Sequence, residues 1–298
     1  MPHSRRSLLS TMSGMVVKDS SSSFSYLGCP IFKGRVKCSY FVNIVQMFRS
    51  RLEGWYAKLL SNMGRVILTK HVLNAIPTHV LACTTIPKTV LNKLNSIMAK
   101  FLWCDKDFDK RRHWVSWDLI SLPFEEGGLG VRDFNDISAA FRVKQVWQWL
   151  QKDSLWADFV DSKYVTGTLN SSQLWKSLLP WVSFTIHHSK YLVGNGEKVD
   201  FWRSNWLGNG PLIERASTTP LDFPSINQVL HNGRWDFTSI GSILSEDTLS
   251  DIVDSGVLIS GGEDKLIWQP NSDGFFSLKS AWNLVRHKSS FNGASNFI

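Results

Sequence analysis

The sequence predicts a mainly α protein, in which an N-terminal helical bundle is followed by an α+β region with two short β-hairpins. The first observation behind this prediction is that apolar residues recur at three- to four-residue spacing through most of the first 150 residues. The second is that extended runs around Asn- and Gly-containing turns replace this period after residue 186. The hydrophobic content of 43% is enough to bury a core.

Three amphipathic helices are expected in succession between residues 36 and 104. The first covers 36–60, and its apolar stripe consists of Phe41, Ile44, Val45, Phe48, Leu52, Trp55 and Leu59. Residues 61–64 interrupt the pattern, and a second helix follows from about Arg65 to Ala75. The third begins near Pro87, a favourable first-turn residue, with the stripe Val90, Leu91, Leu94, Ile97, Met98, Phe101 and Leu102. Short links between such helices favour a bundle.

The rest of the chain is predicted to mix helices with two hairpins. Helices are expected at about 135–150, 153–164, 171–181 and 278–286, the last with Ser277 as its N-cap. Gly127-Gly128-Leu129-Gly130 reads as a turn. The first predicted hairpin pairs 186–193 with 198–206 around Gly194-Asn195-Gly196, and the second pairs 266–268 with 275–277 around 271–274.

We therefore expect four regions along the chain. They are a polar segment at 1–23, the helical bundle at 24–112, a helical connection at 113–182 and a small α+β region at 183–298. No stretch approaches the roughly 20 apolar residues of a membrane helix, so no membrane partner is expected.

Charge is distributed unevenly between the two parts of the chain. Residues 1–112 carry 18 Lys and Arg against 5 Asp and Glu, whereas residues 113–298 carry 15 against 20. A basic N-terminal third suggests a polyanionic partner, although a solvated basic surface would have the same composition.

Motifs for catalysis are missing from the sequence. Metal-dependent phosphoryl transfer needs carboxylates close enough to hold two divalent ions, and there is no adjacent Asp pair. Glu125 and Glu126 are adjacent, but they precede a Gly turn without an aromatic strand before them. Phosphate-binding Gly loops, metalloprotease helices and nucleophile elbows are also missing. No catalytic residue, cofactor or small-molecule substrate is expected.

Metal sites are not indicated by spacing either. The four cysteines, at 29, 38, 83 and 104, form no Cys-x-x-Cys pair. His187 and His188 fall in a predicted strand, where adjacent side chains point to opposite faces, which favours a structural role.

Basic residues interleaved with aromatic residues are the feature that suggests binding. Lys and Arg neutralise phosphates, and aromatic rings stack on unpaired bases. The basic candidates are Lys33, Arg35, Lys37, Lys58, Arg65, Lys70, Lys110, Arg111 and Arg112. Most of the Trp residues, by contrast, are expected to belong to the core.

Several motifs, in order along residues 24–285, resemble the reverse transcriptases of plant-type non-LTR (LINE-like) retrotransposons, often labelled ribonuclease H proteins. The motifs are Tyr26-Leu27-Gly28-Cys29-Pro30-Ile31, Trp55-x-x-Lys58-x-Leu60-Ser61-x-x-Gly64-Arg65, Val72-Leu73-Asn74-Ala75-Ile76-Pro77, Phe101-Leu102-Trp103, His113-x-Val115-x-Trp117, Gly127-Gly128-Leu129-Gly130-Val131-Arg132, Val193-Gly194-Asn195-Gly196, Phe201-Trp202, Asn205-Trp206, Asp264-Lys265-Leu266-Ile267-Trp268 and Gly274-Phe275-Phe276-Ser277.

The resemblance implies that residues 36–104 form the thumb, whose helices grip the primer–template backbone, and that the chain ends inside a zinc-binding-like domain. It implies RNA or DNA as a low-specificity backbone partner and a location in the nucleus or cytoplasm. The expected nucleic-acid-binding residues are Lys58, Ser61, Gly64, Arg65, Lys70, Lys110, Arg111 and Arg112.

Family members also carry a palm with paired Asp upstream, and their Mg²⁺ binds there. The motifs seen here come after that region, so we expect a non-catalytic fragment, truncated at both ends. Two alternatives stay open: a non-functional product of a decayed element, and a domesticated protein-interaction module.

Overall fold

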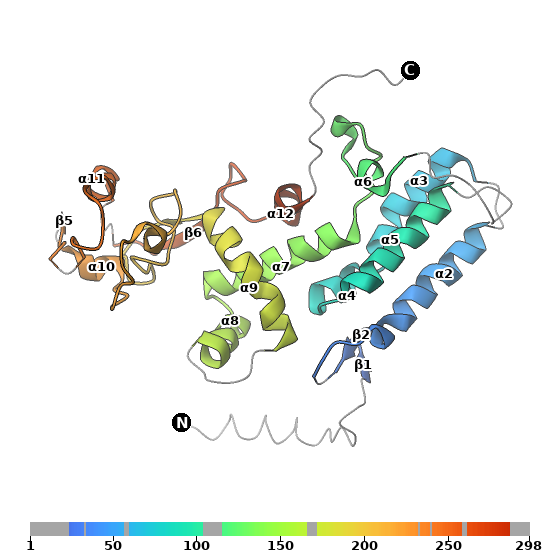
Figure 1. Ribbon diagram of the computed structural model, residues 1–298, viewed down its shortest axis with the longest axis horizontal. Helices are drawn as coiled ribbons and strands as arrows, with labels where there is room; N and C mark the ends of the chain where they lie inside the picture. Colours follow the sequence, from blue (N-terminus) through green and yellow to red (C-terminus); the bar gives the residue numbers. More distant parts are fainter. Residues whose placement is uncertain are drawn as a thin grey trace. The chain divides into compact units, whose positions relative to one another are not determined.

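The protein is mostly helical, with short antiparallel sheets, which confirms the predicted fold class. The computed structural model describes residues 24–32, 34–56, 60–103, 115–165, 172–231, 233–238, 240–257 and 261–286 (Figure 1). The chain divides into two compact units, the first reaching to Asn135 and the second beginning at Asp136. Each unit is described by itself.

The first unit is a small hairpin followed by a helical bundle (Figure 1). Its elements are β1 (Phe24–Tyr26), β2 (Cys29–Ile31), the 3-10 helix η1 (Cys38–Phe41), α2 (Val42–Tyr56), α3 (Asn62–His71), the 3-10 helix η2 (Leu73–Ala75), α4 (Thr78–Cys83), α5 (Lys88–Trp103), α6 (Trp117–Ile120) and the 3-10 helix η3 (Phe124–Glu126). Strands β1 and β2 pair antiparallel, with Tyr26 opposite Cys29.

The core of this unit lies where α5 packs against α2 and α3. Phe48, Leu94 and Met98 are fully buried, and Leu52 is nearly so. Each large apolar side chain removed from water contributes about 1.5–3 kcal/mol. The predicted stripes of α2 and α5 are confirmed on their described residues, except that Trp55 and Ile97 are only half-buried.

Helix α3 begins earlier than the sequence pattern predicted. Residues 61–64 were expected to interrupt the helices, but Ser61 is the N-cap and Asn62 is already helical. The Ser61 side chain accepts a hydrogen bond from the Gly64 amide at 3.2 Å, which offsets the weak helix propensity of Gly and Asn. Helix α3 ends at His71, and the chain continues through η2 toward Pro77.

The segment 62–83 is long and apolar enough to cross a membrane by length and composition, with a mean hydropathy of 1.2. It is, however, broken into α3, η2 and α4. Leu73 and Leu81 within it are fully buried in the first unit. Core helices of soluble proteins meet the same criterion, so the segment carries no argument for a membrane.

The second unit combines helices with two small sheets. Its elements are α7 (Phe134–Gln151, beginning in the first unit), α8 (Leu155–Val160), the π-helix η4 (Asp161–Val165), α9 (Gln173–His187), β3 (Ser189–Leu192), the 3-10 helix η5 (Leu212–Arg215), α10 (Ile226–Val229), β4 (Leu230–His231), β5 (Arg234–Trp235), α11 (Glu246–Asp254), β6 (Lys265–Trp268) and α12 (Leu278–Val285). Its core cluster is centred on Phe201, Trp202 and Trp206. Ser277 caps α12 as predicted, accepting from the Ser280 amide.

The two predicted hairpins of this unit are wrong in their pairing. Strand β3 pairs antiparallel with the distant β6, with Ser189 opposite Trp268, and 198–206 contains no strand. Residues 275–277 form no strand either, although a turn joins the Trp268 amide to the Gly274 carbonyl at 2.8 Å. Hairpins do occur elsewhere, at β1–β2 and at β4–β5.

Helix α9 extends six residues beyond its predicted end. It contains Pro180 and reaches His187, so the predicted strand from 186 begins only at Ser189. His187 and His188 therefore lie at a helix end and not on a strand.

Candidate functional site

The N-terminus of α3 brings together three of the predicted nucleic-acid-binding residues. Ser61 caps the helix, Gly64 is its third residue, and Arg65 follows one turn after the cap. The N-terminus of a helix attracts anions because its first amides lack carbonyl partners and the helix dipole is positive there. No acidic residue lies in the first turn of α3.

Gly64 does not itself offer a free amide. Its N–H donates to the Ser61 hydroxyl, and the Arg65 N–H donates to the Ser61 carbonyl at 3.1 Å. The amides of Asn62 and Met63 have no acceptor among the described residues, so they are the groups that a phosphate oxygen could reach. A methyl group at Gly64 would lie 3.4 Å from Ser61 Oγ, which is ordinary contact.

Lys70 lies away from this helix terminus. It is half-buried, and its Nζ approaches Gly130 so closely that a Cβ there would be only 3.0 Å away. Gly130 has a φ of 66°, which suits glycine in the predicted turn. The structure therefore places Lys70 beside the Gly127–Gly130 turn and does not bring it to the Ser61–Arg65 cluster.

Several candidate residues fall outside the part of the chain that the structure describes. Lys58, Lys110, Arg111 and Arg112 belong to this group, as does Lys33. Their predicted roles stay predictions.

The described residues between 24 and 103 are strongly basic. Nine of them are Lys or Arg, and Glu53 is the one acidic residue in that part of the description. Seven of the nine are exposed: Arg35, Lys37, Arg49, Arg51, Lys88, Lys93 and Lys100. Within the described residues none of the nine forms an ion pair, so their charge is not neutralised locally.

The predicted stacking of Trp side chains on bases has less structural support than the predicted contacts of basic side chains with phosphates. Thirteen of the Trp residues are described, and none of those thirteen is exposed. Trp202, Trp206 and Trp268 are fully buried, as the sequence led us to expect.

Trp117 has a structural partner that the sequence did not reveal. Asp133 accepts hydrogen bonds from Trp117 Nε1 at 2.8 Å and from Asn95 Nδ2 at 2.6 Å. Its other oxygen accepts from the Asn135 amide at 2.6 Å, near the start of α7. Asn95 also accepts from the Phe134 amide at 3.2 Å. This partly buried network joins α5 and α6 to the first residues of α7, and it gives Trp117 a structural role that needs no ligand.

Asp264 plays a comparable part in the second unit. One carboxylate oxygen accepts from the amides of Gly194 and Gly196 at 2.7 and 2.9 Å, and the other accepts from the Lys198 amide at 2.9 Å. The Gly194-Asn195-Gly196 segment is thus a loop clamped by a carboxylate.

The two adjacent histidines are engaged in structural hydrogen bonds. His187 Nδ1 bonds to the Ser183 carbonyl at 2.9 Å and its Nε2 to Glu214 at 3.0 Å. His188 Nδ1 bonds to the Phe184 carbonyl at 2.8 Å. Glu125 and Glu126 lie in η3, exposed and just before Gly127.

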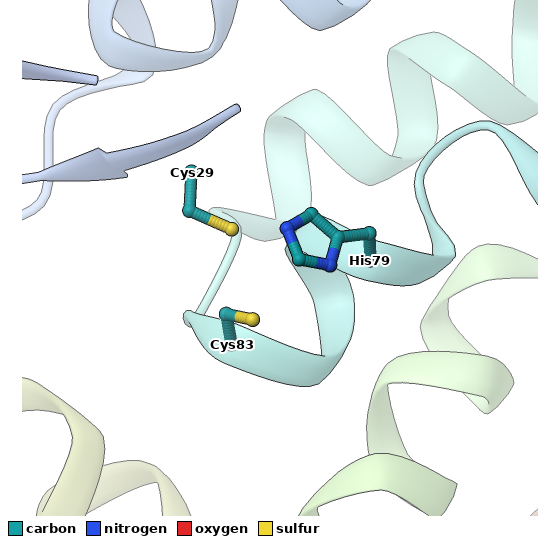
Figure 2. Close-up of side chains that lie close together, drawn as sticks. All are labelled: Cys29, His79 and Cys83. Atoms are coloured by element: carbon teal, nitrogen blue, oxygen red, sulfur yellow. The ribbon is translucent and has the colours of Figure 1, made fainter. Parts of the chain in front are cut away.

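One cluster of metal-ligating side chains was missed by the spacing rules. Cys29, His79 and Cys83 present ligand atoms that all lie within 4.8 Å of one another (Figure 2). Cys29 is the first residue of β2, whereas His79 and Cys83 both lie on α4. Fifty residues separate Cys29 from His79, so no local motif could have shown the cluster.

Comparison with known proteins indicates that the chain is a retrotransposon-related protein. A protein of Arabidopsis thaliana named "Putative ribonuclease H protein" is 30% identical over 276 residues, covering 86% of this chain and 44% of the relative. A Xenopus laevis protein named "Transposon TX1 uncharacterized 149 kDa protein" is 29% identical over 128 residues, covering 42% of this chain and 9% of the relative. An uncharacterized mitochondrial protein of Arabidopsis thaliana is 25% identical over 144 residues, covering 45% of this chain and 93% of the relative.

The chain thus spans less than half the length of the first two of these relatives. No family model and no solved structure matches it.

Proposed function

We propose that the chain is a non-catalytic part of a non-LTR retrotransposon reverse transcriptase, in which residues 36–104 act as a thumb that binds the RNA or DNA backbone. The observation that carries the proposal is the charge of the first unit: nine described Lys and Arg up to Trp103 against one acidic residue, with no ion pair among them. Such a surface binds phosphates and releases their counterions.

The mode of binding follows from which groups are accessible. The described cations are mostly exposed, while the described Trp side chains are buried or half-buried. Contacts to phosphate carry no sequence information, whereas base contacts do. Binding is therefore expected to be strong at low salt and nearly indifferent to base sequence.

Within this surface, the N-terminus of α3 is the proposed anchor. A phosphate there would contact the amides of Asn62 and Met63 and the guanidinium of Arg65. Arg65 follows Ser61 by four residues, so the two lie on the same face of the helix. Lys58, Lys110, Arg111 and Arg112 remain predicted contributors, and Lys70 is the weakest candidate because of its position beside Gly130.

The proposal assigns no catalytic step to this chain. The sequence has no adjacent Asp pair of the kind that holds the two metal ions of a polymerase. Any Mg²⁺ would belong to the palm of an intact enzyme, and no cofactor is proposed for the chain itself.

The test is fluorescence anisotropy with a labelled RNA–DNA duplex of mixed sequence at low salt. Arg65→Ala should weaken binding by about 3- to 10-fold, as expected for one contact of roughly 1 kcal/mol. Lys176→Ala is the matched control, since Lys176 is an exposed cation on α9 in the second unit. Equal losses for the two variants would contradict a role for α3.

A further inference from the structure

We propose that Cys29, His79 and Cys83 bind one zinc ion, with water as the fourth ligand, and that this ion ties the β1–β2 hairpin to helix α4. The three side chains converge from the two elements on one point (Figure 2). This inference is independent of nucleic-acid binding.

The residue types and their placement are those of a tetrahedral zinc site. Two thiolates and an imidazole form a recurrent zinc ligand set. His79 and Cys83 are four residues apart in α4, so they project from the same face of the helix. Strand β2, which carries Cys29, packs directly against α4.

The distances allow a metal with only small movements. Zinc lies about 2.3 Å from sulfur and about 2.0–2.1 Å from imidazole nitrogen, so tetrahedral ligand atoms are roughly 3.5–3.8 Å apart. The ligand atoms lie within 4.8 Å of one another here, and a shift of about 1 Å in side-chain position would close the site. Cys29 is buried while His79 and Cys83 are exposed, which leaves a side open for water.

A backbone carbonyl already orients the imidazole. His79 Nε2 lies 2.9 Å from the carbonyl oxygen of Leu27. Figure 2 shows that this nitrogen, the one farther from Cβ, also faces the two sulfurs. A metal bound at Nε2 would therefore replace the contact with the carbonyl, and Nδ1 would be the second nitrogen that donates to a supporting acceptor. The carbonyl is presented by a tight turn in which Leu27 and Gly28 have φ angles of 48° and 80°. A left-handed leucine is uncommon, and here it belongs to the turn that positions His79.

The two sulfurs lie close together, and one of them is buried, so a bound cation would add a favourable interaction there. Burial, together with the neighbouring Cys83, raises the pKa of the Cys29 thiol to about 11. A divalent cation is the partner that makes two adjacent thiolates favourable, and its binding would displace the thiol protons.

The experiment is titration of the reduced, metal-free full chain with Co²⁺ and then Zn²⁺. We expect one equivalent of Co²⁺ to produce the visible absorption of tetrahedral thiolate coordination, and one equivalent of Zn²⁺ to abolish it. Cys29→Ser, His79→Ala and Cys83→Ser should each weaken binding by more than the 10- to 100-fold typical of losing a supporting hydrogen bond.

Cys38→Ser is the matched control. Cys38 is an exposed cysteine of the same unit that bonds to Thr89 at 3.2 Å and lies outside the cluster. This variant should bind Co²⁺ as the parent does. Circular dichroism of each variant separates a lost ligand from a lost fold.

Alkylation provides a second readout that does not depend on variants. Zinc should protect Cys29 and Cys83 from iodoacetamide, as mapped by peptide mass, and should leave Cys38 as reactive as before. Absence of one-equivalent binding, or binding that survives both Cys29→Ser and Cys83→Ser, would overturn the proposal.

Discussion

Gly64 is the residue at which stability and binding can be separated. Its position in α3 has an ordinary helical backbone, and an added methyl would meet nothing closer than 3.4 Å. Replacing glycine by alanine inside a helix gains about 0.5–1 kcal/mol. Because Cβ atoms in a helix point toward its N-terminus, the same methyl would point toward the end of α3 where a phosphate is proposed to approach.

We therefore expect Gly64→Ala to raise the free energy of unfolding while weakening duplex binding. Urea unfolding and anisotropy on the same preparation measure the two quantities. A variant that is stabilised but binds as the parent does would show that phosphate does not approach this turn.

Tyr191 is the residue whose ionisation should destabilise the fold at high pH. Burial raises its pKa to about 12, with smaller contributions from the carboxylates of Asp264 and Asp153. Its hydroxyl donates to the Leu150 carbonyl at 3.0 Å. The folded state thus favours the neutral phenol more than the unfolded chain does, where the pKa is about 10.

The neutral Tyr191 phenol therefore contributes about 2–3 kcal/mol to the free energy of unfolding below about pH 10. This contribution is lost as pH rises toward 12. Urea unfolding across this range should show the loss in the parent and a flatter profile in Tyr191→Phe. Tyr26→Phe is the control, since Tyr26 is 58% exposed and its replacement should leave the profile unchanged.

At the scale of elements, apolar periodicity predicted the helices well. The stripes of α2 and α5 are read directly from residues such as Phe48 and Leu94, because a helix places them on one face by local geometry alone. Ser277 was likewise recognisable as a cap. The cap at Ser61 was missed because residues 61–64 were taken as an interruption of the helical pattern.

Partners that are distant in the sequence could not be predicted in this way. The Asn-Gly turn at 194–196 indicated a hairpin, but the partner of β3 is β6, more than seventy residues later. The Cys29–His79–Cys83 cluster and the Asp133 network could not be predicted for the same reason. Each is formed by tertiary contacts between residues that are far apart in the sequence, so local spacing does not indicate it.

Asp264 gives a direct test of how the loop at 194–198 is held. Asp264→Ala would leave three backbone amides without their acceptor, and Gly194 and Gly196 are buried. We expect a loss of roughly 2–4 kcal/mol in the free energy of unfolding. Glu263→Ala, at the exposed neighbouring carboxylate, should cost much less, and equal effects would mean that the clamp adds no stability.

At the scale of the whole molecule, charge separates along the chain. Residues 1–112 carry a large excess of Lys and Arg, while the remainder carries a small excess of Asp and Glu. In the first unit most of the described basic residues lie on α2, α3 and α5, whose apolar faces pack in the core. We therefore expect the proposed polyanion to bind the first unit, and the second unit to contribute little attraction of its own.

The most direct measurement is the salt dependence of duplex binding by the full chain. Phosphate contacts release counterions, so the logarithm of the association constant should fall linearly with the logarithm of salt concentration, with a slope of about −0.9 for each phosphate neutralised. Replacing Lys58 and Arg65 together by Ala should make the slope shallower by about one unit for each lost contact. No binding at about 50 mM salt, or a constant that does not change with salt, would contradict the account.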